Sequence, residues 1–126
     1  MLNRQASYLY TIEHRRAKKA EELAKGTKEY KSAAQKLPSM IINCGLLQTI
    51  AFYKAKGDNE GEVYSALEKW LKEEFNIQNS DLIDYIINLP VPDYRVITRE
   101  ALAFSIWLKR FSEIKYKELE AKKKGE

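Results

Sequence analysis

The sequence is poor in the side chains that catalytic and metal sites most often use. Its 126 residues include one cysteine, Cys44, and one histidine, His14, so it holds no CxxC pair and no HExxH zinc motif. A GxSxG motif and a glycine-rich phosphate loop are also absent. We therefore predict no catalytic residue, no metal ligand and no cofactor. The single thiol lies in an apolar stretch, where we expect it to be buried, and fits a reducing compartment.

Targeting signals and membrane-length apolar runs are missing as well. The first residues, MLNRQASYLY, lack the charged start and apolar core of a signal peptide. No apolar run reaches the ~20 residues that a membrane span needs. We therefore expect a cytoplasmic protein without membrane contact. Residues 1–126 are expected to form a single domain, because a chain of this length can bury a core without disulfides or metals.

Charge is abundant but unevenly distributed. Residues 1–57 carry 11 Lys and Arg against 4 Asp and Glu, residues 58–93 carry 2 against 9, and residues 94–126 carry 9 against 5. Two basic ends therefore flank an acidic middle. This pattern favours either contact between the basic parts and nucleic acid or head-to-tail assembly through opposite charges.

One stretch has no charge at all. From Leu37 to Tyr53 every side chain is uncharged, in a protein that is 32% charged. Apolar residues fall on all sides of a helix drawn through this stretch, which is typical of a buried helix. We predict a central helix from Leu37 to Lys56, with Pro38 in its first turn and tight packing at Gly45.

Helical periodicity dominates the rest of the chain, and no segment alternates as a strand does. The predicted class is all-α, a compact single-domain bundle of about six helices around the buried central helix. Besides the central helix, the expected helices are Asn3–Lys25, Lys28–Lys36 after a Thr27 cap, a helix capped by Asp58 or Asn59 and reaching Phe75, Asp81–Leu89, and a last long helix capped by Thr98 after an extended Pro90–Pro92 turn. The Leu37–Pro38 step is expected to end the helix that starts at Lys28.

One charged residue is predicted on a core-facing position. Arg16 falls on the core-facing side of the first helix, where it needs a partner or must extend to solvent.

Basic side chains supply the one candidate site. Arg15 and Lys18 lie on the outer face of the first helix, and Arg99, Arg110 and Lys117 lie close in angle on the last. Positive charge on a stable scaffold suits phosphate contacts, which carry no sequence information. Tyrosines such as Tyr8, Tyr10 and Tyr116 are candidates for stacking on bases. The simpler interpretation is that these are ordinary surface charges and partly buried rings.

Two segments resemble a known family. One has the pattern LPxMIxxxGLxxxxAF and the other YRxxTxEALxFxxWLKRF, at a separation typical of the small α-helical subunit of the Cmr complex, the type III-B CRISPR effector (RAMP module). The matched residues are Leu37, Pro38, Met40, Ile41, Gly45, Leu46, Ala51 and Phe52 in the first segment, and Tyr94, Arg95, Thr98, Glu100, Ala101, Leu102, Phe104, Trp107, Leu108, Lys109, Arg110 and Phe111 in the second.

The resemblance implies a helical subunit without enzymatic activity of its own. Such subunits stack in several copies along the effector backbone, touch the large subunit at one end, and line the channel for guide RNA and target RNA. Lys109 and Arg110 are the basic residues inside the second matched segment, so Lys109 joins the predicted RNA-binding set. Two alternatives stay open: a protein adaptor that never touches RNA, and a hydrolase that uses the carboxylates of the acidic middle.

Overall fold

The computed structural model describes residues 11–125, which form six α-helices and no strand. The predicted all-α bundle of about six helices is therefore confirmed. Residues 3–10 of the predicted first helix, with Tyr8 and Tyr10, lie outside the described residues. The helices are α2 (Ile12–Leu23), α3 (Lys28–Cys44), α4 (Leu46–Lys56), α5 (Asp58–Glu74), α6 (Leu82–Ile87) and α7 (Val91–Gly125).

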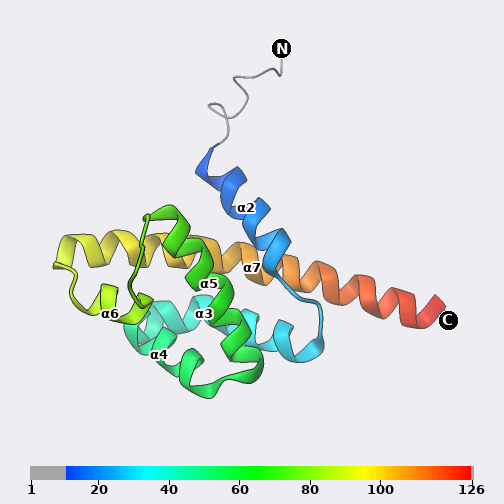
Figure 1. Ribbon diagram of the computed structural model, residues 1–126. Helices are drawn as coiled ribbons and strands as arrows, with labels where there is room; N and C mark the ends of the chain where they lie inside the picture. Colours follow the sequence, from blue (N-terminus) through cyan, green and yellow to red (C-terminus); the bar gives the residue numbers. More distant parts are fainter. Residues whose placement is uncertain (1–10, 126) are drawn as a thin grey trace, which may run out of the picture.

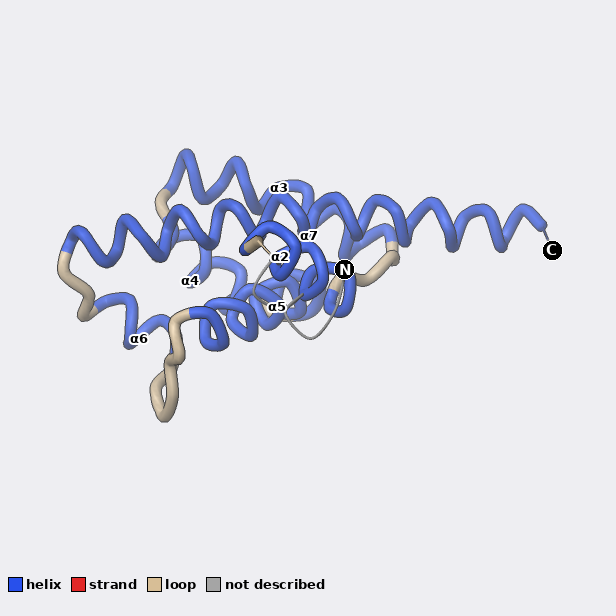
Figure 2. Tube along the Cα trace, turned by 90° about the horizontal axis from the view of Figure 1, so that it is seen from above, coloured by secondary structure: helices blue, strands red, loops and turns tan. Residues whose placement is uncertain are grey.

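The long helix α7 is the element on which most of the bundle packs. Helices α2, α3 and α5 pack against it, α4 packs on α3 and α5, and α6 packs on α4. Figures 1 and 2 show α7 running the length of the molecule, with α6 beside its start and its C-terminal turns projecting beyond the other helices. The largest fully buried side chains come from five helices: Tyr30, Leu37, Leu46, Ile50, Tyr53, Leu67, Trp70, Leu71, Leu82, Ile86, Ile97 and Phe104.

Helix α2 is fixed at both of its ends. At its start the Thr11 hydroxyl accepts the backbone N–H of His14, and the His14 ring accepts the backbone N–H of Thr11, a capping arrangement. At its end the ammonium group of Lys115 on α7 donates to the carbonyl groups of Glu21 and Ala24. A Cβ atom on Gly26 would lie 2.6 Å from the backbone of Lys115. Glycine at this position is therefore what lets the chain leave α2 directly against α7.

The predicted central helix is two helices, and the break is not where we expected it. Helix α3 continues through Leu37 and Pro38 to Cys44, and Gly45 (φ 86°) forms the corner before α4. The prediction that Leu37–Pro38 ends a helix is wrong, because burial of Leu37 and Ile41 in the core outweighs the lost backbone donor of proline. The Tyr53 hydroxyl donates to the Ala33 carbonyl, one turn before Leu37, at 2.7 Å.

The uncharged stretch is buried along one face only. Leu37, Ile41, Leu46, Ile50 and Tyr53 are buried, whereas Ile42 is 66% and Phe52 48% exposed. The expectation that Cys44 is buried is wrong, because its side chain is exposed. An absence of charge alone therefore does not identify an enclosed helix: two amphipathic helices with uncharged outer faces produce the same sequence pattern.

Two further helix starts differ from the prediction. Helix α7 begins at Val91, so Pro90–Pro92 is not an extended turn and Thr98 is not its cap. Pro92 occupies the first turn, where a helix does not need the missing N–H. Helix α5 follows Gly57 without any side-chain cap, and Asp58 is its first residue. Asp81 caps α6 by accepting the backbone N–H of Asp84, close to the predicted start.

Within residues 11–125 no helix combines the length and the apolar character that a membrane crossing requires.

Candidate nucleic-acid interface

The predicted basic residues lie on two helices and in different surroundings. Arg15 and Lys18 are exposed on α2, and Arg99, Arg110 and Lys117 are exposed on α7. Lys109 is only half exposed, because one residue along a helix turns the side chain by ~100° away from Arg110. The structure therefore separates the two basic residues that the second sequence motif places side by side.

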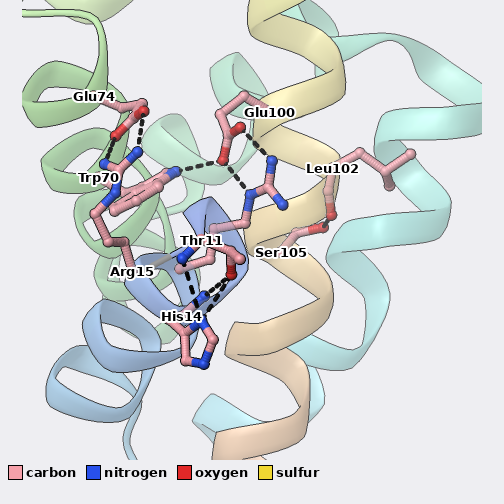
Figure 3. Close-up of polar contacts among 9 residues, drawn as sticks. Thr11, His14, Arg15, Trp70, Glu74, Glu100, Leu102 and Ser105 are labelled. Carbon is pink, nitrogen blue, oxygen red and sulfur yellow. Dashed lines mark hydrogen bonds and ion pairs between the residues drawn. The ribbon is translucent and has the colours of Figure 1, made fainter. Parts of the chain in front are cut away.

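Arg15 is engaged with a carboxylate of the acidic middle. Its guanidinium group donates twice to Glu74 of α5, at 2.5 and 3.1 Å, and this hydrogen bonding raises the pKa of Arg15 above its ordinary value. Figure 3 shows both contacts. Two further ion pairs link this part of the chain to α5: Lys19 of α2 with Glu73 at 2.6 Å, and Lys25, in the loop after α2, with Glu62 at 2.8 Å. Part of the segregated charge in the sequence is thus neutralised inside the molecule.

Arg16 finds the partner that its core-facing position requires. Its Nε and Nη2 atoms donate to the carboxylate of Glu100 on α7 at 2.6 and 2.7 Å, and the indole N–H of Trp70 on α5 donates to the same carboxylate at 2.9 Å. Glu100 is 7% exposed. Hydrogen bonding to Glu100 raises the pKa of Arg16 above its ordinary value. Figure 3 shows Trp70 and Glu100 turned toward one another. This network joins α2, α5 and α7 and has a structural role.

Arg99, Arg110 and Lys117 share the outer face of α7. Arg99 and Arg110 are about three turns apart, or ~16 Å, and Lys117 lies two turns further on, ~10 Å. Arg110 has one ion pair, to Glu113 of its own helix at 3.3 Å. Neither Arg99 nor Lys117 forms an ion pair with any residue in the range 11–125. These cations are therefore available to an external anion.

A groove between α3 and α7 brings several of these groups together. It has a volume of about 470 Å³ and is lined by Lys31, Gln35, Arg110, Glu113, Ile114, Tyr116 and Lys117. Three cations face one carboxylate there, so the groove has a net positive charge. The Lys31 ammonium lies 4.4 Å from the centroid of the Tyr116 ring, a cation–π contact that covers one ring face. We refer to this site as the α3–α7 groove.

The other predicted residues lie outside that groove. Arg99 lines a cavity of about 450 Å³ together with Ile12, Arg16, Glu74, Phe75, Val96 and Glu100. Arg15 and Lys18 line a smaller cleft of about 220 Å³ with Lys19, Glu22, Trp70 and Glu73. Of the six predicted residues, Arg110 and Lys117 thus line the α3–α7 groove, and Arg15 and Lys18 line a separate cleft. Lys31 was missed because its place in the groove depends on how α3 packs against α7, which helical periodicity does not reveal.

The described part of the chain offers no cluster of three or more His, Cys, Asp or Glu side chains that could hold a metal ion. Its most distinct surface features are a cationic groove and an outer helix face with unpaired basic side chains. The class is therefore a small all-α protein whose exposed chemistry suits binding of an anionic partner.

Comparison with known proteins gives the family. A family model described as "CRISPR-associated protein (Cas_Cmr5)" matches residues 3–115. A protein from Thermus thermophilus named "CRISPR system Cmr subunit Cmr5" is 33% identical over 98 residues, which cover 75% of this chain and 83% of that protein. The chain belongs to the Cmr5 family of CRISPR-associated proteins. The resemblance predicted from the two sequence motifs is confirmed.

Proposed function

We propose that the chain is a non-catalytic structural subunit of a type III-B CRISPR ribonucleoprotein effector. In this function it stacks along the effector backbone with further copies of itself, and it contacts the phosphates of guide and target RNA. The name of the Thermus relative, a Cmr subunit, supports membership of such a complex. The convergence of Lys31, Arg110 and Lys117 on the α3–α7 groove is the observation that carries the RNA contact.

The physical basis of this contact is neutralisation of phosphate charge. A groove with three cations and one carboxylate attracts an anionic backbone without reading bases. Arg99 extends the positive face along α7, whereas Arg15 must first leave Glu74, to which it is hydrogen bonded at 2.5 Å. We therefore rank Arg110 and Lys117 above Arg15 as phosphate contacts, with Lys31 added to the set.

Affinity for single-stranded RNA at several salt concentrations tests this proposal. An Arg110→Ala/Lys117→Ala variant should bind more weakly, and the slope of log affinity against log salt should fall by between about 1 and 2. A Lys36→Ala/Lys69→Ala variant removes the same charge from exposed lysines of α3 and α5 that do not line the groove, and its slope should stay near that of the wild type. Equal losses in the two variants would show that only net charge matters and would remove the groove from the proposal.

A protein adaptor that never touches RNA is the second candidate. It is favoured by apolar side chains on the same outer face of α7, since Val96, Ile106 and Ile114 are each nearly half exposed. Cross-linking of labelled target RNA to the assembled complex separates the two candidates. A cross-link to Arg110, Lys117 or Lys31 supports RNA contact, and its absence from this subunit supports the adaptor.

The proposal includes the absence of catalysis, a single domain over residues 1–126 and a cytoplasmic location. The hydrolase alternative needs free carboxylates, whereas Glu73 and Glu74 of α5 form ion pairs with α2 and Glu62 forms one with the loop that follows α2. Incubating the purified chain with labelled RNA and Mg²⁺ or Mn²⁺ should give no turnover. Turnover that one carboxylate substitution abolishes would overturn this part of the proposal.

A further inference from the structure

One tyrosine that the sequence marks as a candidate for base stacking lies in the wall of the α3–α7 groove. Tyr8 and Tyr10 are outside the described residues, whereas Tyr116 of α7 is half-buried and lines the groove. The phosphate contacts proposed above do not use its ring. Proteins that bind single-stranded nucleic acid combine a cationic groove with aromatic rings on which bases stack. The α3–α7 groove contains both of these parts.

The two faces of the Tyr116 ring have different surroundings. The Lys31 ammonium of α3 lies over one face, 4.4 Å from the ring centroid. Among residues 11–125 no second cation and no aromatic ring contacts Tyr116. The contact with Lys31 orients the ring before any ligand arrives, and a site that is already ordered loses less entropy when it binds. The face opposite Lys31 is the one that a flat ligand can use.

Glu113 adds a hydrogen-bond acceptor to the same groove. Its side chain is 28% exposed. Within the described chain it receives two long contacts, from Arg110 Nη1 at 3.3 Å and from Gln35 Nε2 at 3.5 Å. A carboxylate has about four lone-pair positions, so Glu113 can accept a further N–H group. Gln35 of α3 and Arg110 of α7 meanwhile restrict where this carboxylate points.

A nucleobase fits these two groups in size and in chemistry. The groove volume of about 470 Å³ falls within the range of ~300–1,000 Å³ that is usual for ligand pockets. The exocyclic amino group of cytosine is a donor that protein carboxylates accept from in known nucleic-acid complexes. Uracil presents a carbonyl oxygen at that position, which a carboxylate repels. The groove therefore favours a base with an exocyclic amino group over uracil.

We propose that the α3–α7 groove binds one unpaired RNA nucleotide through its base as well as through its phosphate. The base stacks on the face of Tyr116 opposite Lys31, and its exocyclic amino group donates to Glu113. This inference rests on the proposed function, because it assumes that RNA occupies the groove. It adds a selectivity that phosphate contacts alone cannot supply. A base within a duplex does not fit, since its amino group and both of its faces are already in use.

Two strands of equal charge test the stacking contact. Oligocytidine and an abasic ribose-phosphate strand of the same length carry the same phosphates, but only the first carries bases. The wild-type chain should bind oligocytidine about fivefold or more tightly than the abasic strand, which is the lower end of what one stacked base contributes. Tyr116→Leu should lose this difference, and Tyr116→Phe, which keeps the ring, should retain it.

Two controls separate stacking from charge and from general damage. Tyr116→Leu removes no cation, so the slope of log affinity against log salt should stay at the wild-type value. Tyr85→Leu replaces another half-buried tyrosine, on α6 and outside the groove, and should keep the wild-type preference for oligocytidine. The melting temperature of each variant shows whether its fold is intact. The comparison of the two strands on the wild-type chain needs no variant at all.

Oligocytidine against oligouridine tests the contact of the amino group with Glu113. The wild-type chain should prefer oligocytidine about fivefold, as expected for one hydrogen bond to a charged group. Glu113→Gln should bring this ratio close to one, because an amide can donate to the uracil oxygen as readily as it accepts from the cytosine amino group. The ratio is the quantity to compare, since loss of the negative charge should strengthen binding of both strands alike.

The outcomes distinguish this inference from the function on which it rests. If the wild-type chain binds neither oligocytidine nor the abasic strand, the proposed RNA contact fails, and the inference fails with it. If it binds both equally and Arg110→Ala/Lys117→Ala still weakens binding, the RNA contact stands and the base contact is overturned. A preference for oligocytidine over the abasic strand that persists in Tyr116→Leu also overturns the stacking contact. A ratio of cytidine to uridine affinity that is unchanged in Glu113→Gln overturns the amino contact.

Discussion

Adjacent arginines form ion pairs of very different burial. Arg15 and its partner Glu74 lie near the surface, whereas Glu100, the partner of Arg16, is almost fully buried and also accepts the indole N–H of Trp70. Removing one member of a buried pair leaves an uncompensated charge, whereas exposed pairs contribute ~0–1 kcal/mol. Glu100→Ala should therefore lower the free energy of unfolding by about 3 kcal/mol. Glu74→Ala, the matched control, should lower it by at most ~1 kcal/mol.

Urea denaturation of both variants at neutral pH gives the comparison. Similar losses for the two substitutions would mean that the Arg16–Glu100–Trp70 network does not hold α2 against α5 and α7.

Two buried tyrosines differ in whether their hydroxyl has a partner. The Tyr30 hydroxyl has none within residues 11–125, whereas the Tyr53 hydroxyl donates to the Ala33 carbonyl. Burying an unpaired hydroxyl costs ~1–3 kcal/mol, and a made hydrogen bond contributes ~1 kcal/mol. Tyr30→Phe should therefore raise the free energy of unfolding by about 1 kcal/mol, and Tyr53→Phe should lower it by about the same amount. A loss of stability in Tyr30→Phe would indicate a partner for that hydroxyl.

These buried tyrosines also predict how stability depends on alkaline pH. Burial raises the pKa of Tyr53 from its ordinary 10 to about 12 and raises the pKa of Tyr30 and Tyr64 as well. Above pH 10 the unfolded chain releases these protons while the folded chain keeps them, so stability is fully present below pH ~10 and is lost as pH rises. Each tyrosine should contribute a slope of up to about 1.4 kcal/mol per pH unit.

Denaturation between pH 9 and 12 measures this slope, and Tyr30→Phe should reduce it. An unchanged slope in that variant would show that Tyr30 ionises equally in the folded and unfolded chain.

At the scale of helices, the corner between α3 and α4 depends on Gly45. Its φ of 86° lies in a region that residues with a side chain rarely adopt. Gly45→Ala should therefore cost ~1–3 kcal/mol of stability. Gly61→Ala is the matched control, because Gly61 lies within α5 and a Cβ there meets no atom within 4 Å. It should raise stability by ~0.5–1 kcal/mol. Thermal or urea unfolding of both variants should show that the free energy of unfolding falls in Gly45→Ala and rises in Gly61→Ala.

Local signals placed some helix ends, and packing overrode others. The Thr27 cap predicted the start of α3, where the Thr27 hydroxyl accepts the backbone N–H of Tyr30. The helix end predicted at Pro38 and the helix start predicted at Thr98 are both wrong. Helix α3 continues through Pro38 to bury Ile41, and α7 begins seven residues before Thr98. At Pro38 the apolar contacts that decide the outcome come from distant parts of the chain, whereas at the start of α7 a proline in the first turn is compatible with the helix and Thr98 is not needed as a cap.

The candidate site was predicted only in part for the same reason. Helical periodicity correctly placed Arg99, Arg110 and Lys117 on one exposed face, because that face depends on the sequence of a single helix. It did not reveal the ion pair of Arg15 with Glu74 or the cation–π contact of Lys31 with Tyr116. Both depend on contacts between helices far apart in the sequence.

For the whole molecule, the projecting end of α7 should be dispensable for folding. From Glu118 to Lys124 every residue is exposed except Glu120, which is half-buried and forms its ion pair with Lys123 of the same segment. A chain ending at Lys117 should therefore melt within ~2 °C of the full chain, because a ΔΔG below ~0.5 kcal/mol shifts the melting temperature only slightly. Full-length Lys115→Met, which loses the bonds to the end of α2, should melt several degrees lower. Calorimetry measures both melting temperatures. A truncated chain that melts below Lys115→Met would show that the projecting end of α7 does contribute to the fold.

The unbroken course of α7 sets a fixed distance along the molecule. From Val91 to Lys117 it rises by ~39 Å, so the start of α7 and the Lys117 end of the α3–α7 groove cannot approach each other. The helix therefore fixes the distance between its two ends. Inserting one heptad would lengthen it by ~10 Å with little rotation, and inserting two residues would turn its two ends by ~200° relative to each other. In a repeating array whose subunits make contacts at both ends of α7, the length of this helix would set the distance between those contacts and its twist would set the rotation between them.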